Sequence, residues 1–517
     1  MPMTDDPQTL DQALRFWAEK TPNKTFIRSF EDNFTFAETQ KIVRNIAGFL
    51  TAKDIRPGDK VCLLLPRRPE LIFSFLAASS IKALICPINY LENTQHIEEM
   101  TTSLKPTVII LDESTVRDEV LDFIQEYGII YGATVIAVQK TPENPKAVPW
   151  KTCIEHSPTP PLVLLPDDCA YLNFTTGSSG FPKGALCTHA HLFWNTRSAV
   201  EIFQMTADDV HLCMFASFSH PHEIFCRALY TGASLVLLTE ISPKAIAKTI
   251  IRHRVTCMMG LAVMYKMMAR HCKEVALPRL RIAESGGMFT DQEIHRNFLD
   301  AFGLPILSVW GSTETSGIAL ANAPDQYRTD GSMGKPCPCY QVRLVDEEGQ
   351  EVAPGETGEL IFSGPAVTSG YHNTPDFPGR KGWYFSGDLA QKDEEGVFRF
   401  VERKSGMIKV AGLKVYPLQV ELVIQQHPAV KEVAVIGVPE KRRGCVPKAF
   451  ITLEEHAALD VDDLESYCRQ RLASYMVPRD FQLVASLPKI GSGKINKKIL
   501  LANPELCPEL PLPAPAL

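Results

Sequence analysis

Several features that would assign this chain to a common protein class are missing from its 517 residues. A formal net charge of −7 argues against the concentrated basic face that nucleic-acid binding requires. Apolar runs such as Val61–Leu65 and Val163–Leu165 are far too short to span a bilayer. The first residues, Met1–Asp6, have neither the basic leader nor the apolar core of a signal peptide. We therefore expect a cytoplasmic protein with no nucleic-acid partner and no membrane span.

Fourteen cysteines occur without such a leader. This usage is typical of free thiols in a reducing compartment rather than of a disulfide framework. Cys337 and Cys339 form the only close pair, and no His or Cys follows them at the spacing of a zinc finger. The sequence therefore predicts neither a disulfide framework nor a zinc site.

The length and the periodicity predict several α/β units. A chain of this size is too long for one core, so at least two domains are expected. Strand-like and helix-like segments alternate in two regions: Val61–Leu65, Leu71–Ser79 and Leu84–Ile88 in the first, and Ser234–Leu238, Ala245–His253 and Thr256–Met259 in the second. Such alternation indicates parallel sheets with helices on both faces.

The pattern changes after Pro336. Short alternating runs separated by Gly-rich turns predict an antiparallel barrel or sheet, and the last part reads as a small α+β domain. The predicted fold class is α/β: a large N-terminal domain (1–402) of two doubly wound α/β subdomains plus a β-barrel-like subdomain (about 337–402), and a small mobile α+β C-terminal domain (403–503). Residues 504–517 are expected to form a flexible tail.

The most informative stretch is the glycine loop, Thr175–Gly184 (TTGSSGFPKG). It follows a strand-like run, Ala170–Phe174, and precedes a segment with helical spacing from Thr188. Three glycines allow a tight turn that brings N–H groups close to a ligand, four hydroxyls add donors, and Lys183 adds a positive charge. The alternative is an ordinary Gly/Ser surface loop, but this combination favours a polyphosphate grip. The spacing is not that of a Walker loop, and Pro182 argues against a helix that opens at Lys183.

Four further stretches suit a Mg-nucleotide. They are Val309–Thr315 (VWGSTET), Trp383–Asp388 (WYFSGD), Arg403 with Met407–Gly412 (MIKVAG), and Pro488–Ile495 (PKIGSGKI). A hydroxyl can contact an α-phosphate oxygen, one carboxylate can bind the metal ion, and Asp388 after a tight turn suits a ribose diol. Lys494 is carried on a glycine turn near the C-terminus.

These five co-linear motifs, between about residues 10 and 500, resemble the adenylate-forming superfamily of acyl-CoA synthetases, luciferases and peptide-synthetase adenylation domains. The resemblance implies an ATP-dependent acid–thiol ligase, most like an acyl-CoA ligase. Such an enzyme activates a carboxylic acid as an acyl-adenylate with release of diphosphate, and then transfers the acyl group to the thiol of CoA with release of AMP. It implies ATP, Mg²⁺ and CoA, and we expect a monomer or a homodimer.

The same resemblance assigns roles to individual residues. The residues of the glycine loop that hold the β- and γ-phosphates are Thr175, Thr176, Gly177, Ser178, Ser179, Gly180 and Lys183. The residues that lie near adenine and the acyl pocket are Gly286, Gly287, Trp310 and Gly311. Asp388 and Arg403 hold the ribose, Thr313 meets the α-phosphate, and Glu314 with Thr176 binds Mg²⁺. Lys494 contacts the acyl carboxylate and α-phosphate. Lys409 and Gly412 match a loop that faces the active site after the small domain rotates.

The chemistry fits this set of residues. A carboxylate is already ionised at neutral pH, so its attack on the α-phosphate needs no general base. It needs cancellation of developing charge, which Mg²⁺, Lys494 and the hydroxyl loop would supply. This explains why no Ser/His/Asp or paired-carboxylate signature is present.

Three positions depart from the family pattern. Trp310 stands where tyrosine is usual, Ser405 stands at a hinge position where Asp or Lys is usual, and Lys82 stands where glycine is common. We therefore expect the small domain to rotate, without a specific hinge chemistry.

The acyl-pocket motif, Phe215–Phe225, contains two candidates for the histidine gate between the acid and thiol sites, His220 and His222; we favour His220. Pro221 occupies about the place where α-amino-acid-activating relatives carry an Asp, which counts against α-amino acids. Glu223 could bind a displaced ammonium group, although we favour a solvated or paired carboxylate.

Other functions stay open at this point. The main alternative is a stand-alone adenylation enzyme that loads a carrier protein's phosphopantetheine, since both use the same thiol chemistry. A luciferase-like oxygenase is less favoured, and so is a nucleotide-binding regulatory protein without catalysis. Met264, Met288 and Trp310 suggest a mostly apolar wall for an aliphatic or aryl acid.

Overall fold

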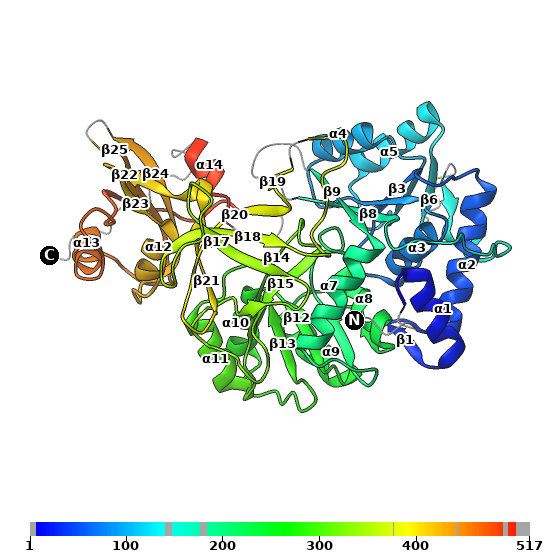
Figure 1. The fold of residues 1–517 in the computed structure, drawn as a ribbon, viewed down its shortest axis with the longest axis horizontal. Helices are drawn as coiled ribbons and strands as arrows, with labels where there is room; N and C mark the ends of the chain where they lie inside the picture. The colour runs from blue at the N-terminus through cyan, green and yellow to red at the C-terminus, as the bar shows by residue number, and fades with distance from the viewer. Residues whose placement is uncertain are drawn as a thin grey trace. The chain divides into compact units, whose positions relative to one another are not determined.

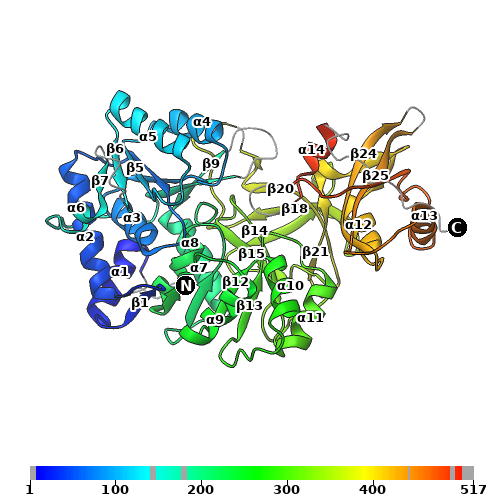
Figure 2. The ribbon, with the colours of Figure 1, turned by 180° about the vertical axis from the view of Figure 1, so that it is seen from behind.

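The structure is a computed structural model, which describes residues 7–139, 147–175, 183–375, 377–440, 443–489 and 495–502. The chain forms two compact units. The larger unit contains Met1–Val342 and Phe362–Tyr384, and the smaller contains Arg343–Ile361 and Phe385–Leu517. Figures 1 and 2 label their elements from two opposite sides. The predicted domain boundary between residues 402 and 403 stays a prediction. Within the described ranges, no helix is both long and apolar enough to cross a bilayer.

The first sheet of the larger unit has seven strands in the order β7-β6-β5-β3-β4-β8-β9. They are β3 (Lys60–Leu64), β4 (Leu84–Pro87), β5 (Val108–Leu111), β6 (Thr134–Ala137), β7 (Val148–Pro149), β8 (Cys169–Phe174) and β9 (Gly184–Thr188). Neighbouring strands are parallel except β8 and β9. One face is covered by α4 (Thr94–Leu104) and α5 (Asp118–Tyr131), whose buried side chains join those of the strands in one hydrophobic cluster. Burial on both faces explains why these strands are short continuous apolar runs.

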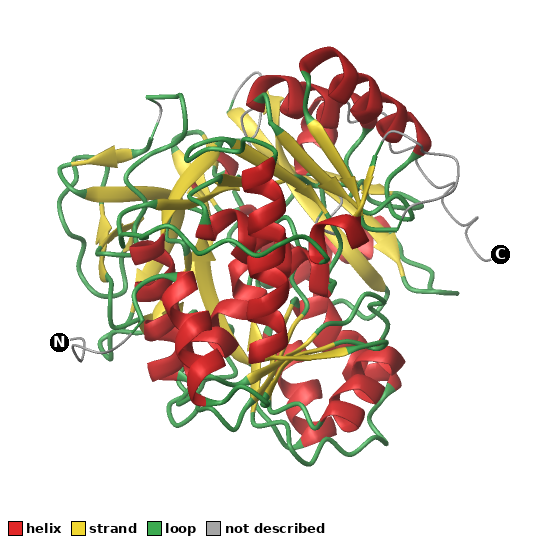
Figure 3. Cartoon of the chain, turned by 90° about the vertical axis from the view of Figure 1, so that its right-hand side faces the viewer, coloured by secondary structure: helices red, strands yellow, loops and turns green. Residues whose placement is uncertain are grey.

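A layer of helices covers the other face. It contains α1 (Leu10–Lys20), α2 (Phe36–Ala52), α3 (Pro69–Ser80), α6 (Trp150–Ile154), α7 (His189–Ile202) and α8 (His222–Thr231). Helix α3 is buried from Leu71 to Ser80. The ring of its Phe75 lies 5.4 Å from that of Tyr171 on β8 and 5.2 Å from that of Phe225 on α8, measured between ring centroids. Figure 3 shows helices in red packed against strands in yellow.

The second sheet has nine strands in the order β16-β15-β14-β13-β12-β10-β11-β1-β2. They are β1 (Thr25–Arg28), β2 (Asn33–Thr35), β10 (Val210–Cys213), β11 (Ser234–Val236), β12 (Cys257–Gly260), β13 (Ile282–Ser285), β14 (Leu307–Ser312), β15 (Gly317–Ala321) and β16 (Lys335–Pro336). The strands from β1 to β14 along the sheet are parallel, and both ends are antiparallel. Helices α9 (Pro243–His253), α10 (Ala262–His271) and α11 (Gln292–Phe302) share a hydrophobic cluster with it.

The rest of the chain is built on two smaller sheets. One contains β17 (Gln341–Val345), β18 (Thr357–Ser363), β20 (Trp383–Lys392) and β19 (Gly379–Arg380), with β21 (Phe398–Arg403) paired to β20. The other has the order β23 (Leu413–Val415), β22 (Ile408–Val410), β25 (Gly444–Leu453) and β24 (Val430–Glu440), with β26 (Asp480–Leu483) beside β25. Helices α12 (Pro417–Gln425) and α13 (Val461–Arg469) share one cluster with this sheet, and α14 (Lys497–Ala502) shares a second.

The predicted α/β class, with a large N-terminal part and a small α+β part, is confirmed. The structure also accounts for Lys82, whose φ of 58° lies in the left-handed region that glycine adopts most easily. Its Nζ lies 2.9 Å from Asp168 Oδ2, a contact that a glycine cannot make.

Candidate active site

The glycine loop joins two neighbouring antiparallel strands, β8 and β9. Its ends are tied together because the Thr175 N–H donates to the Lys183 carbonyl at 2.9 Å and the Lys183 N–H donates to Thr175 Oγ1 at 3.2 Å. Strand β9 begins at Gly184, so Lys183 does not open a helix, as expected from Pro182. The predicted phosphate-binding residues Thr176, Gly177, Ser178, Ser179 and Gly180 lie outside the described residues.

A distant segment, residues 368–372, runs along β9 directly after the loop. The His372 N–H donates to the Gly184 carbonyl at 2.8 Å, and Tyr371 forms a β-bridge with Ala185. Lys183 Nζ lies 5.6 Å from the centroid of the Tyr371 ring, a cation–π distance. Tyr371 therefore sits beside the lysine of the glycine loop, a position that our sequence reasoning missed.

Glu314 lies in the tight connection between β14 and β15 and is 7% exposed. The hydroxyls of Tyr371 and Tyr384 each donate to one of its carboxylate oxygens, the second at 2.9 Å. Burial, and then Glu314 itself, raises the pKa values of both tyrosines, which keeps the hydroxyls protonated as donors. In the part of the chain that the structure describes, Glu314 forms no ion pair with a cationic side chain. A buried carboxylate without a protein counter-charge suits a hard cation such as Mg²⁺.

The turn around Glu314 is fixed by its neighbours. The Thr313 carbonyl accepts the Ser316 N–H at 3.2 Å, while Thr315 Oγ1 accepts the Ser312 N–H at 2.9 Å. At Gly311 a Cβ would lie 2.4 Å from the Gly317 carbonyl oxygen, so the two strands approach too closely for a side chain. Half-buried Thr313 therefore sits in a constrained turn, with the carboxylate of Glu314 next to it.

Trp310 lies on β14, and the pair Gly286 and Gly287 directly follows the neighbouring strand β13. The Trp310 ring stacks on that of Phe362 with 4.4 Å between centroids and 4° between planes. Gly286 follows β13 directly, and a Cβ there would lie 2.8 Å from Val309 Cγ2 on β14. Gly287 has a φ of 73°. The residues assigned to the adenine and acyl region thus lie near or just beyond the carboxyl ends of adjacent parallel strands, where α/β sheets bind ligands.

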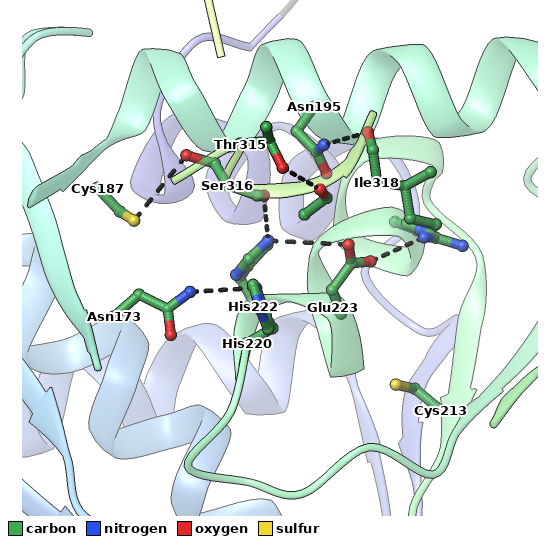
Figure 4. A network of polar contacts seen from close by, with 12 residues as sticks. Asn173, Cys187, Asn195, Cys213, His220, His222, Glu223, Thr315, Ser316 and Ile318 are labelled. Atoms are coloured by element: carbon green, nitrogen blue, oxygen red, sulfur yellow. Dashed lines mark hydrogen bonds and ion pairs between the residues drawn. The ribbon is translucent and has the colours of Figure 1, made fainter. Parts of the chain in front are cut away.

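The two candidate gate histidines have different environments (Figure 4). His222 is 1% exposed, and its Nδ1 and Nε2 lie 2.7 Å from the Tyr171 hydroxyl and 3.0 Å from the Ser316 carbonyl oxygen. Half-buried His220 has a φ of 56°, and its Nδ1 lies 3.1 Å from Asn173 Nδ2. Because both ring nitrogens of His222 are engaged inside the protein, it is not available as a gate. His220 stays the predicted gate.

Glu223 belongs to a buried charge cluster. Its Oε2 lies 2.8 Å from Arg227 Nη2, and Arg227 Nη1 donates to both oxygens of Glu284 at 2.7 and 2.8 Å. All three side chains are less than 5% exposed. Glu223 is therefore a paired carboxylate, which leaves it a poor partner for a substrate ammonium group.

In the smaller unit, the predicted ribose-binding residues form an ion pair. Asp388 on β20 and Arg403 on β21 are register partners, and Arg403 Nε lies 2.7 Å from Asp388 Oδ1. Asp388 is 2% exposed, whereas the Arg403 side chain is 62% exposed. Asp388 lies inside strand β20 and not after a separate turn, although Gly387 before it has a φ of 72°.

The second predicted loop of this unit is a hairpin. Exposed Lys409 lies on β22, and the turn to β23 contains Ala411 and Gly412 with φ values of 47° and 87°. Such a two-residue turn with positive φ matches the twist of the flanking strands. Ser405 lies in a short 3₁₀ turn, Lys404–Gly406. Lys494 lies outside the described residues.

Comparisons with known proteins agree with this arrangement. A family model described as AMP-binding enzyme matches residues 14–372, and one described as AMP-binding enzyme C-terminal domain matches residues 419–494. A feruloyl-CoA synthase of an Amycolatopsis species is 30% identical over 500 residues, which cover 94% of this chain and 98% of that protein. A long-chain-fatty-acid–CoA ligase of Bacillus subtilis strain 168 is 28% identical over 527 residues, covering 96% and 94%. The crystal structure of the anthranilate CoA ligase AuaEII with anthranoyl-AMP is 25% identical, with a TM-score of 0.88 and coverage of 98% and 99%.

These matches confirm the predicted reaction class, an ATP-dependent, AMP-forming acid–thiol ligase that uses Mg²⁺ and CoA. Both family models match in the order in which the motifs occur, and the first covers more than half of the chain. The chain therefore belongs to the AMP-binding enzyme family.

Proposed function

We propose that this chain is an acyl-CoA synthetase for a neutral aryl or aliphatic carboxylic acid. The observation that carries the proposal is the placement of Glu314. Its carboxylate is held by two tyrosine hydroxyls, one of them from the segment that runs along the strand leaving the glycine loop. A metal-binding carboxylate beside a phosphate-binding loop is the arrangement that activation of an acid by ATP requires.

In this proposal each residue has a defined task during adenylation. Glu314, with Thr176, would hold Mg²⁺, which when bound neutralises phosphate charge. Thr313 would contact the α-phosphate, and the glycine loop with Lys183 would grip the β- and γ-phosphates. Lys494 would contact both the acid's carboxylate and the α-phosphate as charge moves to the diphosphate. None of these groups needs to move a proton, because the attacking carboxylate is ionised.

The smaller unit would complete the cycle. Asp388, which is paired with the Arg403 guanidinium, would offer carboxylate oxygens to the ribose hydroxyls. We propose a hinge near residues 402 and 403, with Lys409 and Gly412 presented for thioester formation. His220 would then gate the thiol. The hairpin that carries Lys409 has its turn already formed, which limits the ordering cost of such a step.

The acid class is argued from charge. The Glu223 carboxylate is neutralised by Arg227, so the segment after the gate presents no unpaired acidic side chain to a substrate ammonium. The relatives named above act on feruloyl and long-chain fatty acyl groups according to their names, and both groups lack a second charge. A cytoplasmic location, a monomeric or dimeric state and a carrier protein as an alternative acceptor stay predictions.

One experiment tests the proposal. Purified protein is incubated with ATP, Mg²⁺, CoA and a mixed pool of fatty, aryl, hydroxy and amino acids, and the products are identified by mass spectrometry. An acyl-CoA of a neutral acid is expected. Accumulation of an acyl-adenylate without a thioester would indicate that the acceptor is a carrier protein and not CoA. Activation of only amino acids would overturn the assigned acid class.

A further inference from the structure

We infer that His222 is a positioning residue for adenylation: together with Tyr171 it connects the strand that enters the glycine loop to the turn that carries Glu314. This inference rests on the proposed function of Glu314. The effect that we expect from His222 is transmitted through its hydrogen bond to Ser316 (Figure 4).

The proton positions on His222 follow from its partners. A backbone carbonyl can only accept a hydrogen bond, so Nε2, 3.0 Å from the Ser316 oxygen, carries the ring proton. Nδ1 is then an acceptor, and the Tyr171 hydroxyl donates to it at 2.7 Å. Burial also lowers the pKa of His222 to about 3, so the imidazole is neutral at working pH. The two hydrogen bonds thus select one tautomer and one ring orientation.

The turn that receives this bond is under backbone strain. Ser316 has a φ of 52°, in the left-handed region that non-glycine residues avoid, and the next residue, Gly317, has a φ of 124°, which glycine adopts without strain. Such a conformation persists only where the surroundings hold it. Two hydrogen bonds hold this turn. His222 Nε2 donates to the Ser316 carbonyl, and the Tyr340 hydroxyl donates to the Thr315 carbonyl. Glu314 lies directly before Thr315 in the chain, so its position depends on these two hydrogen bonds.

The other end of the connection is strand β8. Tyr171 is fully buried, and the glycine loop begins four residues later at Thr175. Asn173, two residues beyond Tyr171 and therefore on the same face of the strand, contacts His220. Tyr171 and Asn173 on β8 thus contact His222, the first residue of α8, and His220, two residues before it. The chain of contacts Tyr171–His222–Ser316 joins the phosphate-binding and metal-binding segments, which lie 141 residues apart at Thr175 and Ser316.

A pair of amide substitutions separates positioning from simple space filling. The amide of His222→Gln extends to about the place of Nε2 and can still donate to Ser316, whereas that of His222→Asn ends near Nδ1 and cannot. We expect His222→Asn to weaken Mg–ATP binding about 10–100-fold, the loss typical for partners that orient a metal ligand, and His222→Gln to weaken it less than roughly tenfold. Tyr171→Phe, which removes the hydroxyl that orients the ring, should also weaken Mg–ATP binding measurably, by less than roughly tenfold.

The measurements are calorimetric Mg–ATP binding, ATP–diphosphate exchange, and thioester formation from supplied acyl-adenylate and CoA. Exchange should fall with Mg–ATP affinity in His222→Asn, while thioester formation stays near the wild-type rate. The control is His189→Asn, which removes another buried imidazole, 1% exposed, whose ring nitrogens contact Leu10 and Ser79. It should lower the melting temperature without changing Mg–ATP affinity.

The inference is overturned if Asn and Gln bind Mg–ATP equally well, or if both half-reactions fall together. If His222→Asn does not fold, Tyr171→Phe still decides, because wild-type affinity in that variant would contradict the connection. Because Mg–ATP binding needs no acid, failure to find an acid substrate and failure of this inference are separate results.

Discussion

Replacement of Arg227 by methionine would remove the only cation from a buried cluster of three charges. The guanidinium lies between Glu223 and Glu284, whose side chains are 3% and 1% exposed. Methionine replaces the aliphatic part of the arginine side chain but carries no charge. The variant would therefore leave two carboxylates in the protein interior without a counter-charge.

The cost follows from the burial. Removing one partner of a buried ion pair typically costs about 3–5 kcal/mol, because the remaining charge stays desolvated. The larger unit contains 365 residues, Met1–Val342 with Phe362–Tyr384. With an unfolding entropy of roughly 2.1 cal/mol/K per residue, this loss corresponds to a fall in melting temperature of about 4–7 °C at pH 7.

The pH dependence gives an internal check. Burial already raises the pKa of Glu284, and without Arg227 the pKa of that carboxyl would rise further. A folded-state pKa above the unfolded value means that the folded state binds more protons, so stability increases as the pH falls. The deficit of Arg227→Met should therefore shrink between pH 7 and pH 5.

Scanning calorimetry would measure this effect in wild type, in Arg227→Met and in the triple variant Arg227→Met/Glu223→Gln/Glu284→Gln. The triple variant, in which none of the three cluster positions carries a charge, should recover most of the decrease in melting temperature. Lys151→Met is the control, because its pair with Glu155 is 76% and 63% exposed and should shift the melting temperature by less than about 1 °C. An equally small shift for Arg227→Met at pH 7 would refute the reasoning.

Three further predictions follow from single contacts. Glu314→Gln should raise the Mg²⁺ concentration that gives half-maximal ATP–diphosphate exchange by about 10–100-fold. An unchanged Mg²⁺ titration would exclude Glu314 as a ligand. Gly317→Ala should destabilise the protein by about 1–3 kcal/mol, because φ is 124° and the new Cβ would lie 2.5 Å from Glu223 Oε1; a wild-type melting temperature would contradict this. Although burial alone would raise it, hydrogen bonds led by Arg281 lower the pKa of Asp209 to about 2. The pair's contribution is therefore present above about pH 4 and lost as the pH falls towards 2, so Asp209→Asn should cost roughly 2 kcal/mol at neutral pH, and urea unfolding of the two proteins should converge near pH 2.

Local periodicity predicted the parts of the fold whose pattern is strong. Val61–Leu65 was predicted as a strand and differs from the observed β3 by one residue at each end, and the helix expected from Thr188 begins there because Thr188 and His191 form a capping box. Strand β9 was missed, since Gly184–Thr188 carries no strong pattern of its own and is a strand because it pairs with β8. Pairing with a distant segment leaves little local signal.

The candidate site shows the same division. The motifs were sufficient to nominate Glu314, Asp388 and Arg403 as candidate site residues, because each lies in a stretch that can be recognised from the sequence. Tyr371 lies 57 residues from Glu314 in the sequence, and only the fold brings its hydroxyl to that carboxylate. The pairing of Glu223 was detectable, because Arg227 follows it at i+4 in a helical segment and such pairs face each other.

The alternation of contacts along β8 also constrains how this protein can change. Side chains point to opposite faces at each step of a strand, so a one-residue insertion or deletion before Tyr171 would exchange the two faces. Tyr171 and Asn173 would lose both histidines in a single event, while a substitution at either position affects only one of them. Length variation among relatives of this chain should therefore be rare between Cys169 and Phe174 and should occur in the surface connection that precedes this strand.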